Sequence, residues 1–176
     1  MAELTAPLLH KGLVAPSDLV GCTAEEIEAL MAAQGVTTLP AVYREFLEYG
    51  GHTPYWLARE EWDYTWLLEE AKGVAREIVV DDDGQDWAPF ADAFIFQTHH
   101  GYMFNYFRAS DLTQPDPHFW IYCQGAQIES SGQPFSQYLQ DLAGYLPEAI
   151  RTHQYLYHQG SAPNPPTHHW DITQRP

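Results

Sequence analysis

Histidines are the residues of this chain with the most versatile chemistry, because a neutral imidazole binds metal ions and titrates near neutral pH. The 176-residue chain has nine of them. His99-His100 stands at the tip of a predicted hairpin, where adjacent side chains point apart, and His168-His169 lies in a proline-rich C-terminal stretch. Exposed turn histidines explain these positions better than ligands do, so we predict no metal site.

The acidic run Asp81-Asp82-Asp83-Gly84 suggests a calcium loop, but its surroundings do not fit one. An EF-hand needs oxygen ligands at alternate positions before the glycine and a glutamate at the twelfth position. Val79 occupies the first position and Phe90 the twelfth. Because adjacent carboxylates repel one another and glycine permits a turn, we predict a solvated loop here.

The two cysteines and the serines lack the surroundings of catalytic nucleophiles. Cys22 and Cys123 form no CxxC spacing, so the sequence predicts neither a disulfide framework nor a zinc knuckle. Both are expected to be reduced structural thiols. The chain also has no GxSxG elbow and no GxxxxGK[ST] or GxGxxG phosphate loop. We therefore predict a protein that is not an enzyme and binds no cofactor.

Charge is the most unusual feature of the composition. Eight basic and 24 acidic residues give a formal net charge of −16, and most of the excess lies in residues 1–90. Phosphate backbones and anionic lipid are repelled by such a surface, which argues against direct binding to nucleic acid or membranes. Solubility alone explains an acidic surface, but the natural binding partner of this chain is a basic protein.

Tryptophans near the acidic stretches could anchor such a partner, although core packing explains them equally well. The candidate partner-binding residues are Glu60, Glu61, Asp63, Glu69, Glu70, Asp81, Asp82, Asp83 and Asp86, with Trp56, Trp62 and Trp87 as anchors.

Helix signals dominate the first half of the chain. Thr23 and Glu26 have the spacing of a capping box, and Gly35 follows the apolar stripe of this helix as a stop signal. Pro40 suits the first position of a second helix that ends at Gly50-Gly51. Between residues 60 and 77 an apolar repeat predicts a third helix, which precedes the acidic loop.

From residue 93 the apolar period changes to two. Residues 93–98 and 102–107 read as strands joined by a hairpin at 99–101; 118–123 is a third strand, and a short fourth lies near 126–129. The expected fold class is α+β, with a mainly antiparallel twisted sheet and helices packed around it.

The C-terminal part begins with the clearest amphipathic pattern of the chain. Pro134 opens a helix whose apolar face should dock on the sheet, and Pro147 restarts another helix through about residue 157. We expect a single domain over residues 1–159 and an extended proline-rich tail over 160–176.

Apolar stretches in this chain are short. Charged or strongly polar residues interrupt every one before the roughly 18 residues that a membrane span needs. Residues 1–16 lack the order of a secretory signal, so we expect a cytoplasmic protein.

Four segments together resemble the SUKH superfamily, named for the Smi and Knr type cell-wall regulators of fungi. They are Thr23-Ala24-Glu25-Glu26-Ile27; Leu39-Pro40 leading through Tyr43 and Phe46-Leu47 to Gly50-Gly51; His100-Gly101-Tyr102-Met103-Phe104 with Asp116-Pro117; and Pro134-Phe135-Ser136-Gln137-Tyr138-Leu139. The resemblance covers most of residues 20–146. It implies an α+β fold in which the matched residues are scaffold, and it supplies no catalytic motif.

Bacterial members of this superfamily resemble immunity proteins of toxin systems. The resemblance therefore implies a non-catalytic binding protein that neutralises a cognate toxin domain. The net charge of −16 adds the expectation that this toxin domain is basic, and nuclease domains are of this kind because they attract phosphate. One alternative is a scaffold or regulatory adaptor of the same fold. A second is a small metal-dependent hydrolase that uses His99, His100 or His118 with an aspartate.

Overall fold

The computed structural model describes residues 1–126 and 128–160, and it has the predicted α+β fold. In this part of the chain, six α-helices accompany one four-stranded antiparallel sheet. The helices are α1 (Ala2–His10), α2 (Ala24–Gln34), α3 (Ala41–Gly50), α4 (Tyr64–Glu69), α5 (Ala71–Arg76) and α6 (Phe135–His158). The strands are β1 (Phe94–His99), β2 (Met103–Phe107), β3 (His118–Cys123) and β4 (Glu129–Pro134). None of these helices has both the length and the apolar character needed to cross a membrane.

The sheet is a meander in which the strands lie in the order β1-β2-β3-β4, as the sequence predicts. His100 and Gly101 both have positive φ, 49° and 72°, and they form the centre of a tight turn in which the Tyr102 amide donates to the His99 carbonyl at 3.2 Å. The fourth strand is displaced from its predicted position near 126–129 to 129–134. Its sequence is polar, so backbone pairing with β3 determines its position and no hydrophobic period reveals it.

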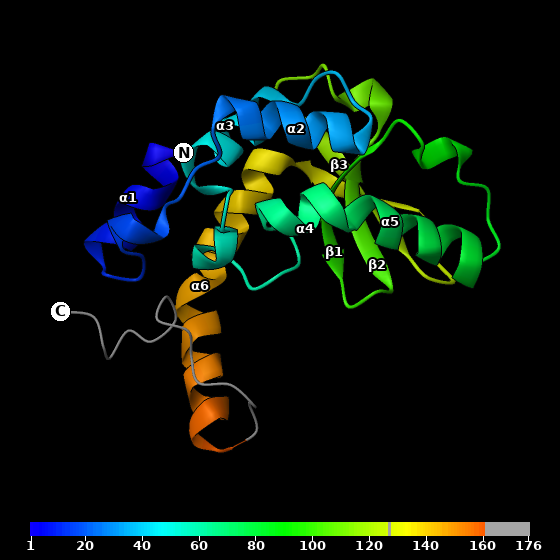
Figure 1. Ribbon diagram of the computed structural model, residues 1–176. Coiled ribbons are helices and arrows are strands. Elements are labelled where there is room, and N and C mark those ends of the chain that lie inside the picture. Colours follow the sequence, from blue (N-terminus) through cyan, green and yellow to red (C-terminus); the bar gives the residue numbers. More distant parts are fainter. Residues whose placement is uncertain (127, 161–176) are drawn as a thin grey trace.

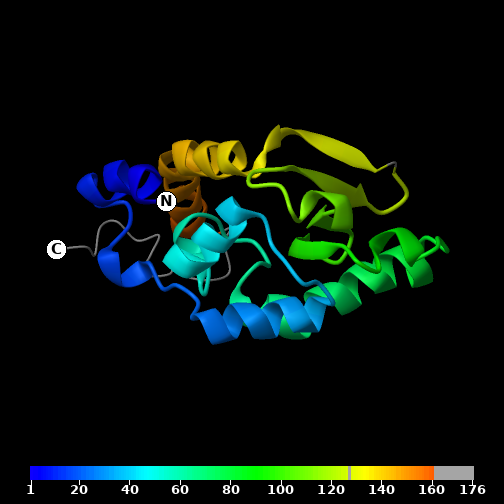
Figure 2. The same ribbon diagram turned by 90° about the horizontal axis from the view of Figure 1, so that it is seen from above.

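Helices lie on both sides of this sheet. Figure 1 shows α4 and α5 across the front of β1 and β2. In Figure 2 the blue α2 and the green α5 follow one side of the molecule, whereas the yellow start of α6 lies on the other. The sheet is therefore the middle layer, and α6 faces the strands from the side opposite to α5.

The caps predicted for α2 and α3 are largely confirmed. The Thr23 hydroxyl accepts a hydrogen bond from the Glu26 amide at 3.2 Å, the Glu26 carboxylate accepts one from the Thr23 amide at 2.8 Å, and Gly35 ends α2 with a φ of 71°. Pro40 stands one position earlier than predicted, as the residue that precedes the first turn of α3. Helix α1 was not predicted; it packs against α6, and Pro7 lies inside it.

The loop predicted at the acidic run is wrong in its first half. Residues Glu77–Asp82 form a π-helical turn that continues from α5, and the chain reverses only at Gly84, with a φ of 64°. Ile78 and Val79 are 1% and 0% exposed. The burial of these two side chains in the hydrophobic core keeps the segment helical, although its carboxylates repel one another.

A restart of the helix at Pro147 is also wrong, because α6 runs without interruption from Phe135 to His158. Proline removes one backbone hydrogen bond from a helix interior. Leu146 and Ile150, each 1% exposed, anchor the helix in the core on both sides of the proline. Beyond these anchors the helix projects from the body of the molecule (Figure 1). Of the predicted tail, all but Gly160 lies outside the described residues.

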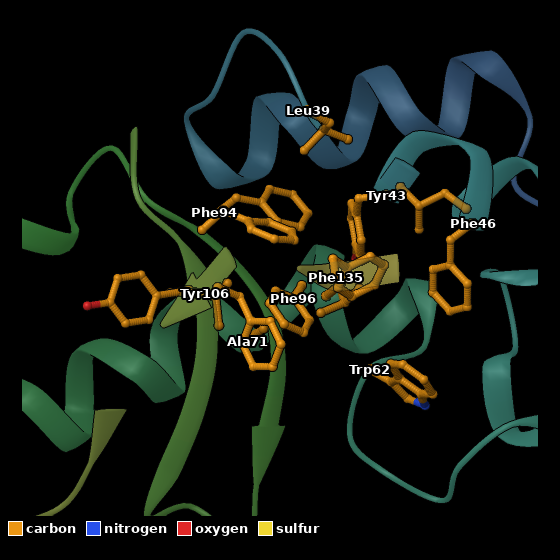
Figure 3. Close-up of a cluster of buried hydrophobic side chains, with 14 of the residues drawn as sticks. Leu39, Tyr43, Phe46, Trp62, Ala71, Phe94, Phe96, Tyr106 and Phe135 are labelled. Atoms are coloured by element: carbon orange, nitrogen blue, oxygen red, sulfur yellow. The ribbon is translucent and has the colours of Figure 1, made fainter. Parts of the chain in front are cut away.

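Aromatic rings from helix and sheet fill the core, as Figure 3 shows. Tyr43 of α3 lies at the centre, with its ring centroid 5.2 Å from those of Phe94 in β1 and Phe135 at the start of α6. Phe96 is 4.8 Å from Phe107 and 5.3 Å from Phe135. These contacts hold α3 and α6 at one end of the sheet and leave its hairpin end less covered.

Candidate functional site

The two faces of the sheet differ in composition and in cover. On the face toward α5, which we call the closed face, Phe90 packs edge-on against the rings of Phe104, Tyr106 and Tyr122, at centroid distances of 5.3–5.7 Å. Helix α6 covers only part of the opposite face: Phe135 packs 5.3 Å from Phe96 and 5.6 Å from Phe107, and the ring of Tyr138 lies 5.0 Å from that of Phe119. We call this second face the open face.

A pocket of about 330 Å³ occupies the uncovered part of the open face. Its base comes from three neighbouring strands, with Gln97 on β1, Asn105 on β2 and Ile121 on β3. Tyr138 of α6 and Glu60, which precedes α4, also line it. We call it the open-face pocket.

Hydrogen bonds within this pocket form a short polar chain. Gln97 Oε1 accepts from Asn105 Nδ2 at 2.8 Å and from the Tyr138 hydroxyl at 2.9 Å. Burial raises the pKa of Tyr138 well above its usual value, so this hydroxyl keeps its proton. Gln97 and Asn105 are only 4% and 6% exposed. The pocket base is therefore a fixed array of polar groups that are largely removed from water.

One acceptor in this array is unsatisfied. Asn105 Oδ1 is buried and has no hydrogen-bond partner among the described residues. A buried polar atom without a partner is uncommon, because it loses its bonds to water and gains nothing in return. Asn105, a residue that lines the pocket, therefore carries a buried acceptor for which the described chain supplies no donor.

Glu60 forms one side of the pocket through a contact with the hairpin. Its Oε2 lies 2.8 Å from His99 Nδ1, and each of the two side chains is 29% exposed. The segment is held against the edge of β1, where the Thr98 amide donates to the Glu61 carbonyl at 3.0 Å and the Thr98 hydroxyl donates to Glu61 Oε2 at 2.7 Å.

A second cavity of about 430 Å³ shares Glu60 and lies beside the first. Glu60, Glu61 and Asp63, predicted as partner-binding residues, all line it together with Tyr55 and Trp66. Asp63 accepts from the Tyr55 hydroxyl at 2.6 Å and caps α4 through the Trp66 amide at 3.2 Å. Burial, reinforced by the Asp63 carboxylate, raises the pKa of Tyr55 to about 12. The structure thus brings these three predicted acids together.

Five more predicted acids lie on or beside the helices that follow Asp63. Glu69, Glu70, Asp81 and Asp82, and Asp86 in the loop after the π-helical turn, are exposed, as is Glu77. None of the six forms an ion pair within residues 1–126 and 128–160. We call these six exposed residues the acidic segment.

Asp83, which was predicted to face a partner, instead faces the sheet. Its Oδ2 accepts from the Tyr122 hydroxyl at 2.7 Å and from the Gly125 amide at 2.9 Å. These bonds tie the end of the π-helical turn to the loop after β3. Asp83 therefore has a structural role and leaves the candidate contact surface.

Two of the three predicted tryptophan anchors belong to the core. Trp56 is 2% exposed and Trp62 1%, and each indole N–H donates to a backbone carbonyl, of Gly50 and Ala58 respectively. Figure 3 shows Trp62 among the core side chains. Neither ring is accessible to a partner, which corrects that prediction. Trp87 is half-buried, with its ring 5.5 Å from that of Phe90.

The described residues contain no group of three or more His, Cys, Asp or Glu side chains arranged to hold a metal ion. His118 and His100 are exposed, and His99 contacts Glu60. Cys22 and Cys123 are free thiols, as predicted, and burial raises the pKa of Cys22 to about 12. The hydrolase alternative therefore has no ligand cluster in the described part of the chain.

Sequence reasoning missed the open-face pocket, although a signal was present. Gln97 and Asn105 are amides within strands that otherwise read as apolar and aromatic runs. A polar side chain in such a run indicates a position where the sheet is not simply packed on a helix.

Comparison with protein-family models, with curated proteins and with solved structures found no significant match.

Proposed function

We propose that this chain is a non-catalytic binding domain with a SUKH-like fold, an immunity protein that neutralises a basic toxin domain. The observation that carries the proposal is the acidic segment, which exposes six carboxylates without cationic partners among the described residues. A protein surface of this kind attracts a positively charged partner from a distance.

Two of the cations contact groups of the protein itself, which strengthens the argument. Lys72 donates to the carbonyls of Gln34 and Phe90 at 3.1 and 3.2 Å, and also to that of Ala93. The Arg108 guanidinium lies 3.2 Å from the centroid of the Trp120 ring. These two charges are turned toward the protein, so they do little to neutralise the acidic segment.

The family part of the proposal rests on the resemblance and on the positions of the matched residues. Tyr43, Phe46 and Phe135 are core residues, 1%, 1% and 0% exposed, and Gly101 supplies a positive φ at the hairpin. Scaffold roles of this kind agree with what the resemblance implies. A nuclease toxin must attract phosphate and is therefore basic, so an acidic immunity protein would associate with it rapidly at low ionic strength.

The test is co-expression of this chain with the product of the neighbouring gene in a host that the toxin arrests. Rescue of growth, together with a purified complex whose affinity falls as salt rises, is the expected result. Two variants with the same change in net charge, Asp82→Lys in the acidic segment and Glu3→Lys on α1 as control, separate local from general charge effects. Arrest that persists while the chain is well expressed would overturn the immunity role and favour the adaptor alternative.

A further inference from the structure

We infer that the open-face pocket binds the side chain of an arginine from a protein partner. This inference rests on the proposed function, because it names the chemistry that the partner inserts. Its starting point is the unsatisfied Asn105 Oδ1, an acceptor on a residue that is 94% buried and lines a pocket of about 330 Å³.

Two groups of the pocket that lack a hydrogen-bond partner in the described chain are acceptors. One is Asn105 Oδ1. The other is Glu60 Oε1, because the hydrogen bond of Glu60 within residues 1–126 and 128–160 is made by Oε2, to His99. Two acceptors, one of them charged, call for a ligand that carries several N–H donors and a positive charge. Arg guanidinium presents five donors in a planar fork, and it loses less hydration on burial than an ammonium does.

Apolar groups beside these acceptors suit the rest of an arginine side chain. Met103, Phe119 and Ile121 line the same pocket, and all three come from strands β2 and β3. Long cationic side chains bury their methylene groups on apolar surface while the charged head finds acceptors. The pocket therefore matches both parts of an arginine, the stem and the head.

No cation from residues 1–126 or 128–160 lines the pocket. Arg59 is the nearest base in the sequence to Glu60, but it lines the adjoining cavity, and its guanidinium lies 3.1 Å from His153 Nε2 on α6. The overall charge of −16 further favours a cation from outside the molecule. Charge complementarity and the unsatisfied acceptor thus point to the same ligand.

The direct test uses small probes and the full chain, so it does not depend on knowing the partner. N-acetyl-arginine amide is titrated into the isotope-labelled protein and followed by NMR at the side-chain amides of Gln97 and Asn105. Saturable shifts with a Kd on the order of millimolar are expected for a single side chain. The neutral isostere N-acetyl-citrulline amide should bind at least about tenfold more weakly, because it lacks the charge.

The probes also define what would overturn the inference. Absence of saturable shifts at Gln97 and Asn105 with the arginine probe would remove the pocket as a site. Equal binding of citrulline would show that the pocket does not recognise charge. Equal binding of N-acetyl-lysine amide would show that the pocket accepts any cationic side chain, and it would overturn the assignment to arginine.

Variants separate a binding role of Asn105 from a structural one. Asn105→Leu removes the unsatisfied acceptor, while Gln97 Oε1 keeps its bond from Tyr138, so thermal stability should hold or rise although arginine binding is lost. A merely structural asparagine would instead lower the Tm when replaced. Glu60→Gln should weaken the arginine probe at least about fivefold, whereas Glu69→Gln, an exposed acid outside the pocket, should leave it unchanged.

A second test uses the partner protein in place of the small probes. If a basic toxin domain binds and Glu60→Gln and Asn105→Leu leave its affinity unchanged, the arginine pocket is wrong while the proposed function stands. If the neighbouring product does not bind but the arginine probe does, the proposed function is wrong and the pocket stands.

Discussion

The two faces of the sheet are built from alternate residues of the same strands, yet they serve different ends. On the closed face Phe104 and Tyr122 stack with centroids 5.0 Å apart, and the Phe90 ring packs edge-on against both. On the open face their neighbours Met103 and Ile121 line a pocket that α6 leaves uncovered. The comparison teaches that one strand can pack one set of side chains into the core while the alternate set lines an open pocket.

The largest expected effect tests the closed face. Phe104→Ala removes a ring that is 0% exposed and should lower the free energy of unfolding by about 3–5 kcal/mol. Met103→Ala, one residue earlier and half-buried on the open face, should cost about 1 kcal/mol or less. Urea unfolding of both variants measures the difference. Equal losses would mean that the two faces contribute equally to stability.

A smaller effect on stability is expected from replacing acids of the run 81–83, and its size depends on whether the side chain faces the sheet or the solvent. Asp83→Ala leaves the Tyr122 hydroxyl without its acceptor and should cost about 1–3 kcal/mol. Asp82→Ala, at an exposed position, should change stability by less than about 0.5 kcal/mol. The double variant with Tyr122→Phe should recover part of the loss, because it removes the unsatisfied donor as well. A full additive loss in that cycle would contradict the assigned bond.

Lys72, on helix α5, should make the free energy of unfolding depend on pH. Burial lowers the pKa of Lys72 to about 8, against about 10.4 in an unfolded chain. Between these values the unfolded state binds more protons, so unfolding free energy should rise as pH increases from about 8 toward 10.

Lys72→Met removes the titrating group and should flatten this rise. Measurements are best kept below pH 10. The pKa of Tyr55 is raised from about 10 to about 12 in the folded state, so above pH 10 the unfolded state loses this proton first and the free energy of unfolding falls. Urea titrations of the two proteins between pH 7.5 and 9.5 give the comparison. Parallel pH profiles would show that Lys72 titrates normally.

The smallest effect on stability is expected from the acidic segment. Asp81→Lys combined with Asp82→Lys should change unfolding free energy by less than about 0.5 kcal/mol, because both side chains are exposed and lack ion pairs in the described chain. The same variant should slow association with a basic toxin domain and reduce its salt dependence. Stopped-flow association rates at two salt concentrations provide the measurement. An unchanged rate would exclude these two residues from the encounter surface.

Local signals predicted much of the fold. The Thr23 cap, the hairpin glycine and the period-two strands describe interactions within a few residues, so they can be recognised without knowing the rest of the molecule. Prediction failed where packing between segments far apart in the chain determines the local structure. The turn after α5 is helical because Ile78 and Val79 are buried, and α6 passes through Pro147 because Leu146 and Ile150 hold it on the core.

The candidate site was predicted only in part, for the same reason. Glu60, Glu61 and Asp63 are close in sequence, so their common cavity follows from local geometry. The pocket on the open face joins Glu60 to His99 and Gln97 to Tyr138, pairs separated by 39 and 41 positions. Such pairs meet only when the sheet and α6 have assembled.

By itself the sequence determined the α+β class, the charge of −16 and the ends of α2 and α3, because these depend on composition and on neighbours along the chain. Tertiary structure alone decided that Asp83 faces inward, that Trp56 and Trp62 lie in the core, and that Asn105 Oδ1 has no donor among the described residues. The physical reason is that the environment of a side chain depends on packing between segments far apart in the chain.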